Sequence, residues 1–411
     1  MINICAREPQ QFGISIIVAI WAAVLAGAPL NAQCPDAVDH VTVPMAVEGN
    51  APIVTLTFKK QDGSSRRARF VFDSGGGGII LNQGLAKDLG EKPIGPLISS
   101  DGQRFQEVEI PAAWAGGMPI ELRSGRAFMH LGAASFTNRD TVEGLLPGKA
   151  FEHYQVVLDY PRQEWSVGEP GTLKHRGERI SAPFIASSGH PRIEVSLGEE
   201  TFGMLLDTGT QLTLFREDFL QRWSRDNPGW PRSRGPVGPA NVPGVADDAL
   251  LLRIPVLKIG SLNIARVAAV SRPDQTYSAT KFETSAAIVG ALGGNVLCQF
   301  RVEIDYPDQL LFLERSTKIQ EDDFQTVGLV LDTNAAGDLV VRAVSPSASS
   351  ITRQNIFPGD VILQIGSRSK APYTLTMAGR ALAGAVGERK RLYILRNGKP
   401  LIVEATVSRI I

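Results

Sequence analysis

Two short motifs in this chain place an aspartate, a hydroxyl residue and a glycine in that order behind an apolar stretch. They are Asp73-Ser74-Gly75 and Asp207-Thr208-Gly209, and positions 73 and 207 are 134 apart. Two carboxylates held about 3 Å apart cannot both ionise, so they share one proton and can act together as general base and general acid. The other interpretation is that both aspartates only cap turns, where Asp-Ser and Asp-Gly are common. The choice depends on whether the fold brings the carboxylates together.

The sequence repeats itself around these motifs. VFDSGGGGIIL at 71–81 aligns without a gap over LLDTGTQLTLF at 205–215, and VEGLLPGKAFEHYQVVLDYP at 142–161 aligns over IVGALGGNVLCQFRVEIDYP at 288–307. The second pair of segments is offset by 146 positions, 12 more than the first. The Pro- and Gly-rich residues 227–244 account for this excess as an inserted surface loop. We therefore expect two copies of one lobe, in which the two motifs occupy equivalent places.

The elements that carry the motifs are predicted to be strands. Alternating and β-branched runs occupy 53–60 and 67–72 in the first copy, and 192–198 and 201–207 in the second. A short helix is expected after each motif, over 82–89 and 216–223. Gly90 is placed to end the first helix as a C-terminal glycine cap. Each aspartate thus lies where a strand ends and a loop begins.

The paired motifs resemble the two active-site loops of aspartic proteases of the pepsin and retropepsin type. The resemblance covers both lobes, about 275 residues. Gly144 and Gly290 match the downstream segment that forms a psi-shaped loop in that family. The resemblance implies a mainly β fold with two homologous lobes and an active site between them. It implies that Asp73 and Asp207 activate a water for peptide hydrolysis, with no metal or cofactor.

The residues beside the aspartates have supporting roles in this interpretation. A side chain at Gly75 or Gly209 would block the approach of the two loops, and the backbone N–H groups there can bond the carboxylates. By resemblance, the Ser74 and Thr208 hydroxyls cross-link the loops through the opposite backbone. The departure from the family is the glycine run 76–78, where the second lobe has Thr210, Gln211 and Leu212. A glycine-lined wall would leave room for a bulky substrate side chain or a close substrate backbone.

A flap is expected to cover such a site. The segment LISSDGQRFQEVEI at 97–110 reads as a hairpin with Asp101-Gly102 as its turn, and it lacks the tyrosine of a pepsin-type flap. This favours a retropepsin-like flap.

The last hundred residues change in pattern and resemble a PDZ domain of the bacterial type. FPGDVILQIG at 357–366 is the most specific part, and Asn397-Gly398 provides the turn of a final hairpin. The resemblance places the peptide-carboxylate loop at Gly328, Leu329 and Val330. A helix over 374–385 would form the other wall of the groove. The alternative is that its apolar residues merely pack the domain's core, namely Leu375, Ala378 and Leu382.

The N-terminus reads as a secretory signal. Arg7 precedes an apolar run at 12–30 and small residues, which places cleavage after Ala32 or, second, after Ala28. An uncleaved membrane anchor is the alternative. The mature chain would be periplasmic or extracellular. Only Cys34 and Cys298 would remain, either as one disulfide or as separate thiols, and the five histidines show no metal-ligand spacing.

Composition and chain order exclude other classes. The chain has 42 basic and 42 acidic residues in 411 with no long block of either sign, which argues against nucleic acid as a partner. A trypsin-like serine protease needs its His and Asp before the Ser, and only His40 precedes Ser74 in the mature chain. The remaining alternative is a catalytically silent peptide-binding scaffold with the same lobes.

We therefore expect an exported, monomeric aspartic endopeptidase whose PDZ domain recruits or gates a protein or peptide substrate. The expected organisation is a signal peptide at 1–32, lobes at 33–178 and 179–316, and a PDZ domain at 317–411.

Overall fold

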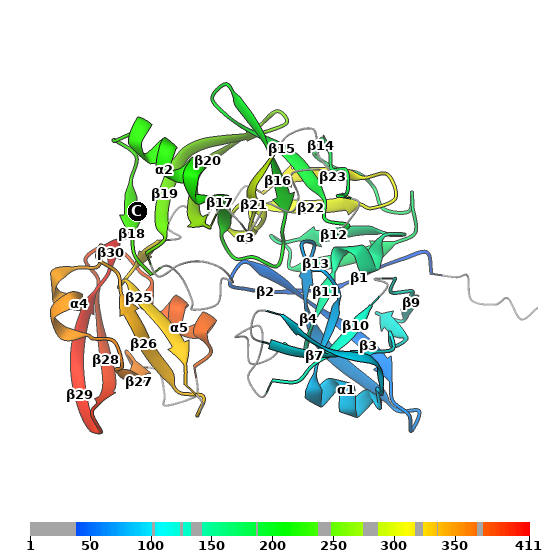
Figure 1. Ribbon diagram of the computed structural model, residues 1–411, viewed down its shortest axis with the longest axis horizontal. Helices are drawn as coiled ribbons and strands as arrows, with labels where there is room; N and C mark the ends of the chain where they lie inside the picture. Colours follow the sequence, from blue (N-terminus) through cyan, green and yellow to red (C-terminus); the bar gives the residue numbers. More distant parts are fainter. Residues whose placement is uncertain are drawn as a thin grey trace, which may run out of the picture. The chain divides into compact units, whose positions relative to one another are not determined.

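The computed structural model describes residues 38–411, apart from segments 101–102, 124–125, 133–141, 186–187, 237–247, 274–286, 317–323, 335 and 368–372. The predicted signal at 1–32, Cys34 and the Asp101-Gly102 turn lie outside the described residues. The chain is mainly β, as expected (Figure 1). No helix in the described part of the chain is both long and apolar enough to span a bilayer.

A six-stranded sheet joins the two copies of the repeat. Its order is β1 (His40–Pro44), β13 (Glu164–Gly168), β12 (Gln155–Asp159), β22 (Phe300–Asp305), β23 (Leu310–Arg315) and β14 (Glu178–Ser181). The central pair, β12 and β22, comes from equivalent positions of the two copies and runs antiparallel. Gln155 lies opposite Asp305 and Asp159 lies opposite Arg301. The local twofold relation of the lobes therefore passes between these two strands.

Each copy adds a sheet of its own. The first has the order β6 (Pro93–Ser100), β7 (Gln103–Val108), β10 (Ala127–His130), β5 (Ile79–Asn82), β11 (Gly144–Pro147), β4 (Ser65–Asp73), β3 (Ala51–Lys59), β8 (Ala113–Ala115) and β9 (Met118–Ile120), with β2 (Ala46–Glu48) also on β3. The second has the order β15 (Arg192–Leu197), β16 (Glu200–Leu206), β21 (Ile288–Leu292), β17 (Thr213–Arg216), β20 (Leu262–Arg272), β19 (Leu250–Ile259) and β18 (Arg232–Arg234).

The registers of these sheets reproduce the sequence repeat. In the first lobe β11 runs parallel to β4 with Gly144 opposite Phe70. In the second lobe β21 runs parallel to β16 with Gly290 opposite Met204. Residues 70 and 204 differ by 134, and residues 144 and 290 differ by 146. The two strands of each pair therefore come from the two sequence segments that repeat with these two offsets. The two copies have the same local fold. Of the inserted loop predicted at 227–244, the described residues 227–236 include strand β18, which pairs with β19, and the rest lies outside the described residues.

The helices follow the predicted boundaries closely. α1 (Gln83–Leu89) begins at Asn82, whose side chain accepts from the Leu85 N–H, and ends at Gly90 with φ 76°. α2 (Glu217–Asp226) packs Leu220 and Trp223 into the core of its lobe. Both predicted helices are confirmed. Two shorter turns, η1 (Gly148–Phe151) and α3 (Gly294–Leu297), follow β11 and β21 at equivalent places.

The hairpin expected over 97–110 is present as β6 and β7. The two strands pair antiparallel, and Ser100 lies opposite Gln103 next to the turn. β7 also pairs with β10, which in turn lies parallel to β5 directly after the first active-site loop. The hairpin is therefore part of the same sheet as that loop.

The C-terminal residues form a separate five-stranded sheet. Its elements are β25 (Leu329–Thr333), β26 (Leu339–Val344), α4 (Ser350–Asn355), β27 (Val361–Ile365), α5 (Leu375–Leu382), β28 (Arg389–Arg396) and β29 (Lys399–Thr406), with β24 (Gln325–Thr326) paired to β30 (Ser408–Arg409). The predicted Asn397-Gly398 hairpin is confirmed, with φ 50° and 75°. Ala378 and Leu382 are buried in the hydrophobic core of this sheet, and Leu375 is partly buried against it.

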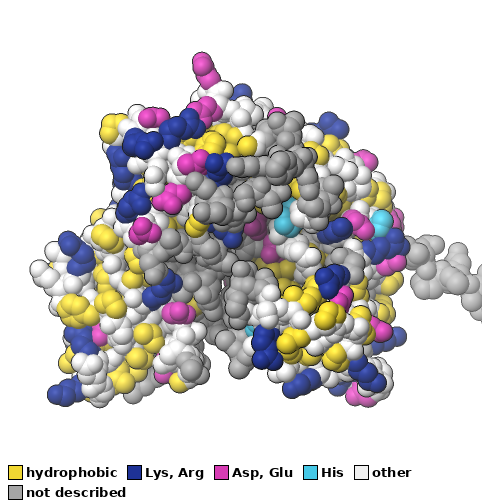
Figure 2. Space-filling model, in the orientation of Figure 1, with side chains coloured by type: hydrophobic (Ala, Val, Ile, Leu, Met, Phe, Trp, Pro, Cys, Tyr) yellow, Lys and Arg dark blue, Asp and Glu magenta, His cyan; other side chains and the backbone are white. Residues whose placement is uncertain are grey.

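Charged side chains of both signs are interspersed over the face shown in Figure 2, in keeping with the balanced composition.

Candidate active site

The two predicted aspartates end equivalent strands. Asp73 is the last residue of β4, with Pro147 of β11 opposite it. Asp207 follows the last residue of β16, and its N–H donates to the Leu292 carbonyl of β21 at 3.1 Å. A parallel neighbour strand therefore fixes the backbone of each aspartate, because the ladder continues up to the loop.

A reciprocal set of hydrogen bonds ties the two loops together. The Ser74 hydroxyl donates to the Leu206 carbonyl at 2.7 Å and accepts from the Thr208 N–H at 3.0 Å. The Thr208 hydroxyl donates to the Phe72 carbonyl at 2.7 Å and accepts from the Ser74 N–H at 3.0 Å. Both side chains are buried. We call these four bonds the cross-brace. They join residues 134 positions apart and hold the lobes in one relative position at the loops.

The cross-brace predicts a stability effect. Thr208→Val keeps the side-chain shape but removes the hydroxyl that bonds the Ser74 N–H and the Phe72 carbonyl in a buried place, which should lower the free energy of unfolding by about 2–3 kcal/mol. Thr42→Val is the control, because Thr42 is exposed and should change stability by less than about 0.5 kcal/mol. Denaturant unfolding measures both. Equal effects of the two substitutions would contradict the role of the brace.

The carboxylates face each other across the two glycines. The Gly75 N–H donates to Asp73 Oδ1 and the Gly209 N–H to Asp207 Oδ1, both at 3.0 Å. A Cβ atom built on Gly209 would lie 2.3 Å from Asp73 Cγ, and one on Gly75 would lie 2.9 Å from Asp207 Cγ. Each glycine therefore makes room for the opposite carboxylate. The structure brings all six predicted residues of the two motifs into one site.

The pair shares its ionisation. Burial raises the pKa of Asp207, against hydrogen bonds from the Thr210 N–H, the Asp73 side chain and the Gly209 N–H, and against the charge of His190. A hydrogen bond between the Asp73 and Asp207 carboxyl groups requires that one of them is protonated, so this geometry favours one shared proton. The arrangement holds one acid and one base within reach of a single small molecule.

The glycine run is only partly the open wall expected from the sequence. A Cβ on Gly76 would lie 2.8 Å from Leu145 Cδ2, and one on Gly78 would lie 2.9 Å from the Phe128 ring, whereas Gly77 has nothing within 4 Å. Gly76 and Gly78 thus allow close packing inside the first lobe, and only Gly77 faces open space. The two loops also differ in one backbone hydrogen bond. The Thr210 N–H donates to the carboxyl oxygen Oδ1 of Asp207, whereas the Gly76 N–H donates to the backbone carbonyl of Asp73.

Two further titratable side chains lie beside the pair. The Tyr306 hydroxyl is buried and has no hydrogen-bond partner among the described residues. A Cβ on Gly148 would meet this hydroxyl at 2.3 Å and the Ser74 Cα at 3.0 Å, which places it under the first loop. Burial, and then the charge of Asp73, raise the pKa of Tyr306. Only the alignment of the Asp-Tyr-Pro ends marks Tyr306 in the sequence.

His190 is the second of these side chains, and no sequence pattern marks it. Its imidazole lies near Asp207 and the Gly76 backbone. Burial lowers the pKa of His190, whereas the Asp207 charge and the Gly76 backbone favour its charged form.

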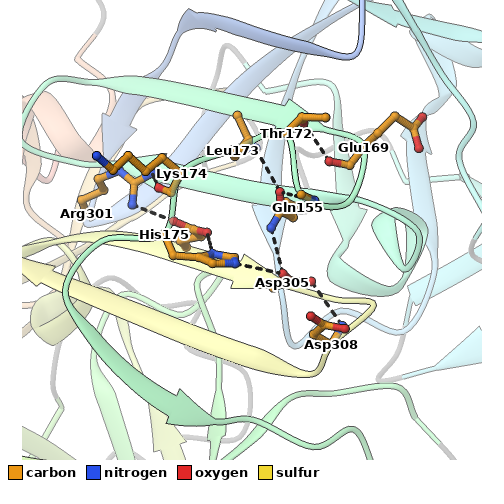
Figure 3. A network of polar contacts seen from close by, with 11 residues as sticks. Gln155, Glu169, Thr172, Leu173, Lys174, His175, Arg301, Asp305 and Asp308 are labelled. Carbon is orange, nitrogen blue, oxygen red and sulfur yellow. Dashed lines mark hydrogen bonds and ion pairs between the residues drawn. The ribbon is translucent and has the colours of Figure 1, made fainter.

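Asp159 and Asp305, the other repeated aspartates, have structural contacts. Asp159 accepts from the Arg162 N–H at 3.0 Å and pairs with its guanidinium at 2.9 Å. Asp305 is buried and accepts from Gln155 Nε2 at 2.8 Å, within the polar network of Figure 3. Gln155 in turn accepts from the Leu173 N–H at 3.1 Å, and His175 pairs with buried Glu303 at 2.5 Å. This network fixes the segment that connects the lobes.

The residues predicted for peptide-carboxylate binding belong to the C-terminal sheet. Gly328 has φ 79° and precedes β25, whose first residues are Leu329 and Val330. β25 is an edge strand of its sheet. No cluster of His, Cys, Asp and Glu able to hold a metal occurs within the described ranges.

No protein-family profile matches this chain, and no curated protein matches it. Among solved structures, it is similar to an aspartic proteinase from Irpex lacteus, with 14% sequence identity and a TM-score of 0.43. The match covers 69% of this chain and 99% of that protein.

Proposed function

We propose that this protein is an aspartic endopeptidase. The observation that carries the proposal is the pair of facing carboxylates at the centre of the cross-brace. Turn-capping aspartates would not need the opposite lobe, yet each carboxylate here fills space left by a glycine of the other loop. The reciprocal bonds of Ser74 and Thr208 fix that geometry.

The mechanism follows from the shared proton. A water bonded to both carboxylates loses a proton to the ionised member and attacks the scissile carbonyl, while the protonated member donates to the carbonyl oxygen. The proton taken from water then goes to the amide nitrogen as the C–N bond breaks. The hydroxyl group that received the other proton returns it to the second carboxylate, which restores the pair. The Gly75 and Gly209 N–H groups hold one oxygen of each carboxylate, so the other oxygens are aimed at the water and the substrate. The β6–β7 hairpin is our candidate for the flap that covers the bound peptide.

The direct test is peptide cleavage by the purified protein. A mixture of unstructured peptides is incubated from pH 3 to 7 with and without pepstatin, and products are identified by mass spectrometry. Cleavage that pepstatin suppresses is the expected result. Binding of peptides without cleavage at every pH would favour the catalytically silent scaffold instead.

We also propose that the C-terminal sheet is a PDZ domain that captures a peptide C-terminus and so recruits or gates the substrate. The edge position of β25 and the left-handed Gly328 before it support this role, because backbone N–H groups in such a turn can bind a carboxylate. The protein would act after export, in the periplasm or outside the cell, on a protein or peptide substrate and as a monomer.

The PDZ proposal predicts dependence on a free carboxylate. A fluorescent peptide with a free C-terminus should bind at least about tenfold more tightly than its amidated form, since a lost charge-assisted bond costs about 1.5–3 kcal/mol. Gly328→Ala should abolish this difference, because its Cβ would lie 2.6 Å from Ala348 Cβ. Gly337→Ala is a matched control with a similar φ of 83° and open space around it. Equal binding of both peptides to the unaltered chain would refute the proposal.

A further inference from the structure

His190 lies at the end of a loop that leads into the second lobe. The loop is closed by backbone bonds from the Ile185 N–H to the His190 carbonyl at 3.0 Å and from the Arg192 N–H to the Pro183 carbonyl at 2.9 Å. Gly189 has φ 72°, and a Cβ there would lie 2.7 Å from the Lys149 side chain. The histidine is therefore held by its own backbone and by packing against the first lobe.

The His190 imidazole is buried near the aspartate pair. Nε2 is removed from solvent and has no hydrogen-bond partner among the described residues. The Leu206 N–H donates to the Pro191 carbonyl at 2.9 Å, so the residue after His190 is bonded to the residue before Asp207. The Asp207 charge and the Gly76 backbone act on the ring. An imidazole nitrogen buried without a partner is costly, so its position near the Asp207 carboxyl group calls for a role.

We propose that His190 is a positioning residue of the aspartate pair: when protonated, it stabilises the singly ionised pair and extends activity to lower pH. The proposal rests on the proposed peptidase function. The Thr210 N–H donates to Asp207 Oδ1, whereas the N–H of Gly76, at the equivalent position of the first loop, donates to the Asp73 backbone carbonyl. A cation near the pair favours the ionised form of a carboxyl group.

The sign of the effect follows from reciprocity. A carboxylate at Asp207 favours the imidazolium, and the imidazolium favours the carboxylate by the same free energy. Burial lowers the pKa of His190, so the ring is neutral at pH 7 and gains its charge on acidification. That charge then opposes protonation of the second carboxyl group. The other ionisable groups around the loop and the pair are Asp73, Lys149, Arg192, Glu194 and Tyr306.

The first experiment compares pH profiles of kcat/KM for the unaltered chain, His190→Gln and the control His153→Gln, whose ring is exposed beside Arg123. We expect His190→Gln to move the acid limb up by about half a pH unit or more, with the alkaline limb unmoved. This corresponds to about a threefold loss well below the midpoint of the limb. His153→Gln should leave both limbs in place. A loss by the same factor at every pH would show a merely structural role and overturn the proposal.

The second experiment does not depend on activity. The His190 ring is titrated by NMR in the unaltered chain and in Asp207→Asn. We expect a lower midpoint in Asp207→Asn, because the neutral amide no longer favours the imidazolium. An unchanged midpoint would refute the coupling. If no peptide is cleaved but the midpoint moves, the peptidase proposal fails while the electrostatic coupling stands.

Discussion

Asp207→Asn should reduce kcat/KM for peptide cleavage by at least about 10³-fold at every pH, and Asp73→Asn should do the same. An asparagine can neither take a proton from water nor return it, so either substitution leaves the pair without its acid-base function. The double variant should be no slower than either single variant, because the two groups act as a unit. Steady-state cleavage of a mapped peptide measures these losses.

The same substitution carries an internal check on folding. Burial raises the pKa of Asp207, so this carboxyl group opposes folding once the pH exceeds its unfolded value of about 3.9. Asp207→Asn removes that unfavourable contribution, and its melting temperature at pH 7 should equal or exceed that of the unaltered chain. Asp159→Asn is the control for activity, because Asp159 lies in the central sheet. The kcat/KM of this variant should stay within about threefold of that of the unaltered chain. An active Asp207→Asn variant would exclude the proposed chemistry.

Gly209→Ala should lower kcat/KM by about 10²-fold or more. The new Cβ would lie 2.3 Å from Asp73 Cγ, so the carboxylate must move away from its partner. A displacement of about 1 Å at the reacting groups is enough for a loss of this size. The fold should be retained. The loss of kcat/KM should therefore be larger than the fraction of unfolded protein, judged from the melting temperature, can explain.

Gly77→Ala is the matched control for this result. It makes the same chemical change in the first loop, at a position with nothing within 4 Å of the added Cβ. Activity within about threefold of the unaltered chain is expected. If Gly77→Ala and Gly209→Ala lose activity equally, the glycines act through loop flexibility and the carboxylates are not held by close approach.

The local features of the fold could be predicted because each depends on a short segment of the sequence. The helix cap at Asn82, the left-handed Gly90 and the Asn397-Gly398 turn depend on a few neighbouring residues, and the structure has them as expected. The repeat also fixed which strands are equivalent. The repeat and the resemblance predict that the Asp73 and Asp207 carboxylates face each other. The two motifs alone also allow the interpretation that both aspartates only cap turns.

The environment of the site could not be predicted, since it depends on residues brought together only by folding. His190 and Tyr306 lie in segments with no periodicity or motif that refers to the aspartates. The glycine run was interpreted as one open wall, but Leu145 and Phe128 fill the space beside Gly76 and Gly78. The spacing of Leu382 in its helix is compatible with a place in a groove or in the core. The structure buries it in the core, where α5 packs on the sheet.

The central claim is that the two aspartates hold one proton between them. It is tested most directly by ¹³C NMR titration of the aspartate carboxyl carbons, with Asp73→Asn and Asp207→Asn used for assignment. We expect both carbons to respond in two coupled steps whose midpoints differ by at least about 2 pH units. In either single variant the remaining aspartate should titrate in one step. Two independent, single-step titrations near pH 3.9 in the unaltered chain would contradict the account.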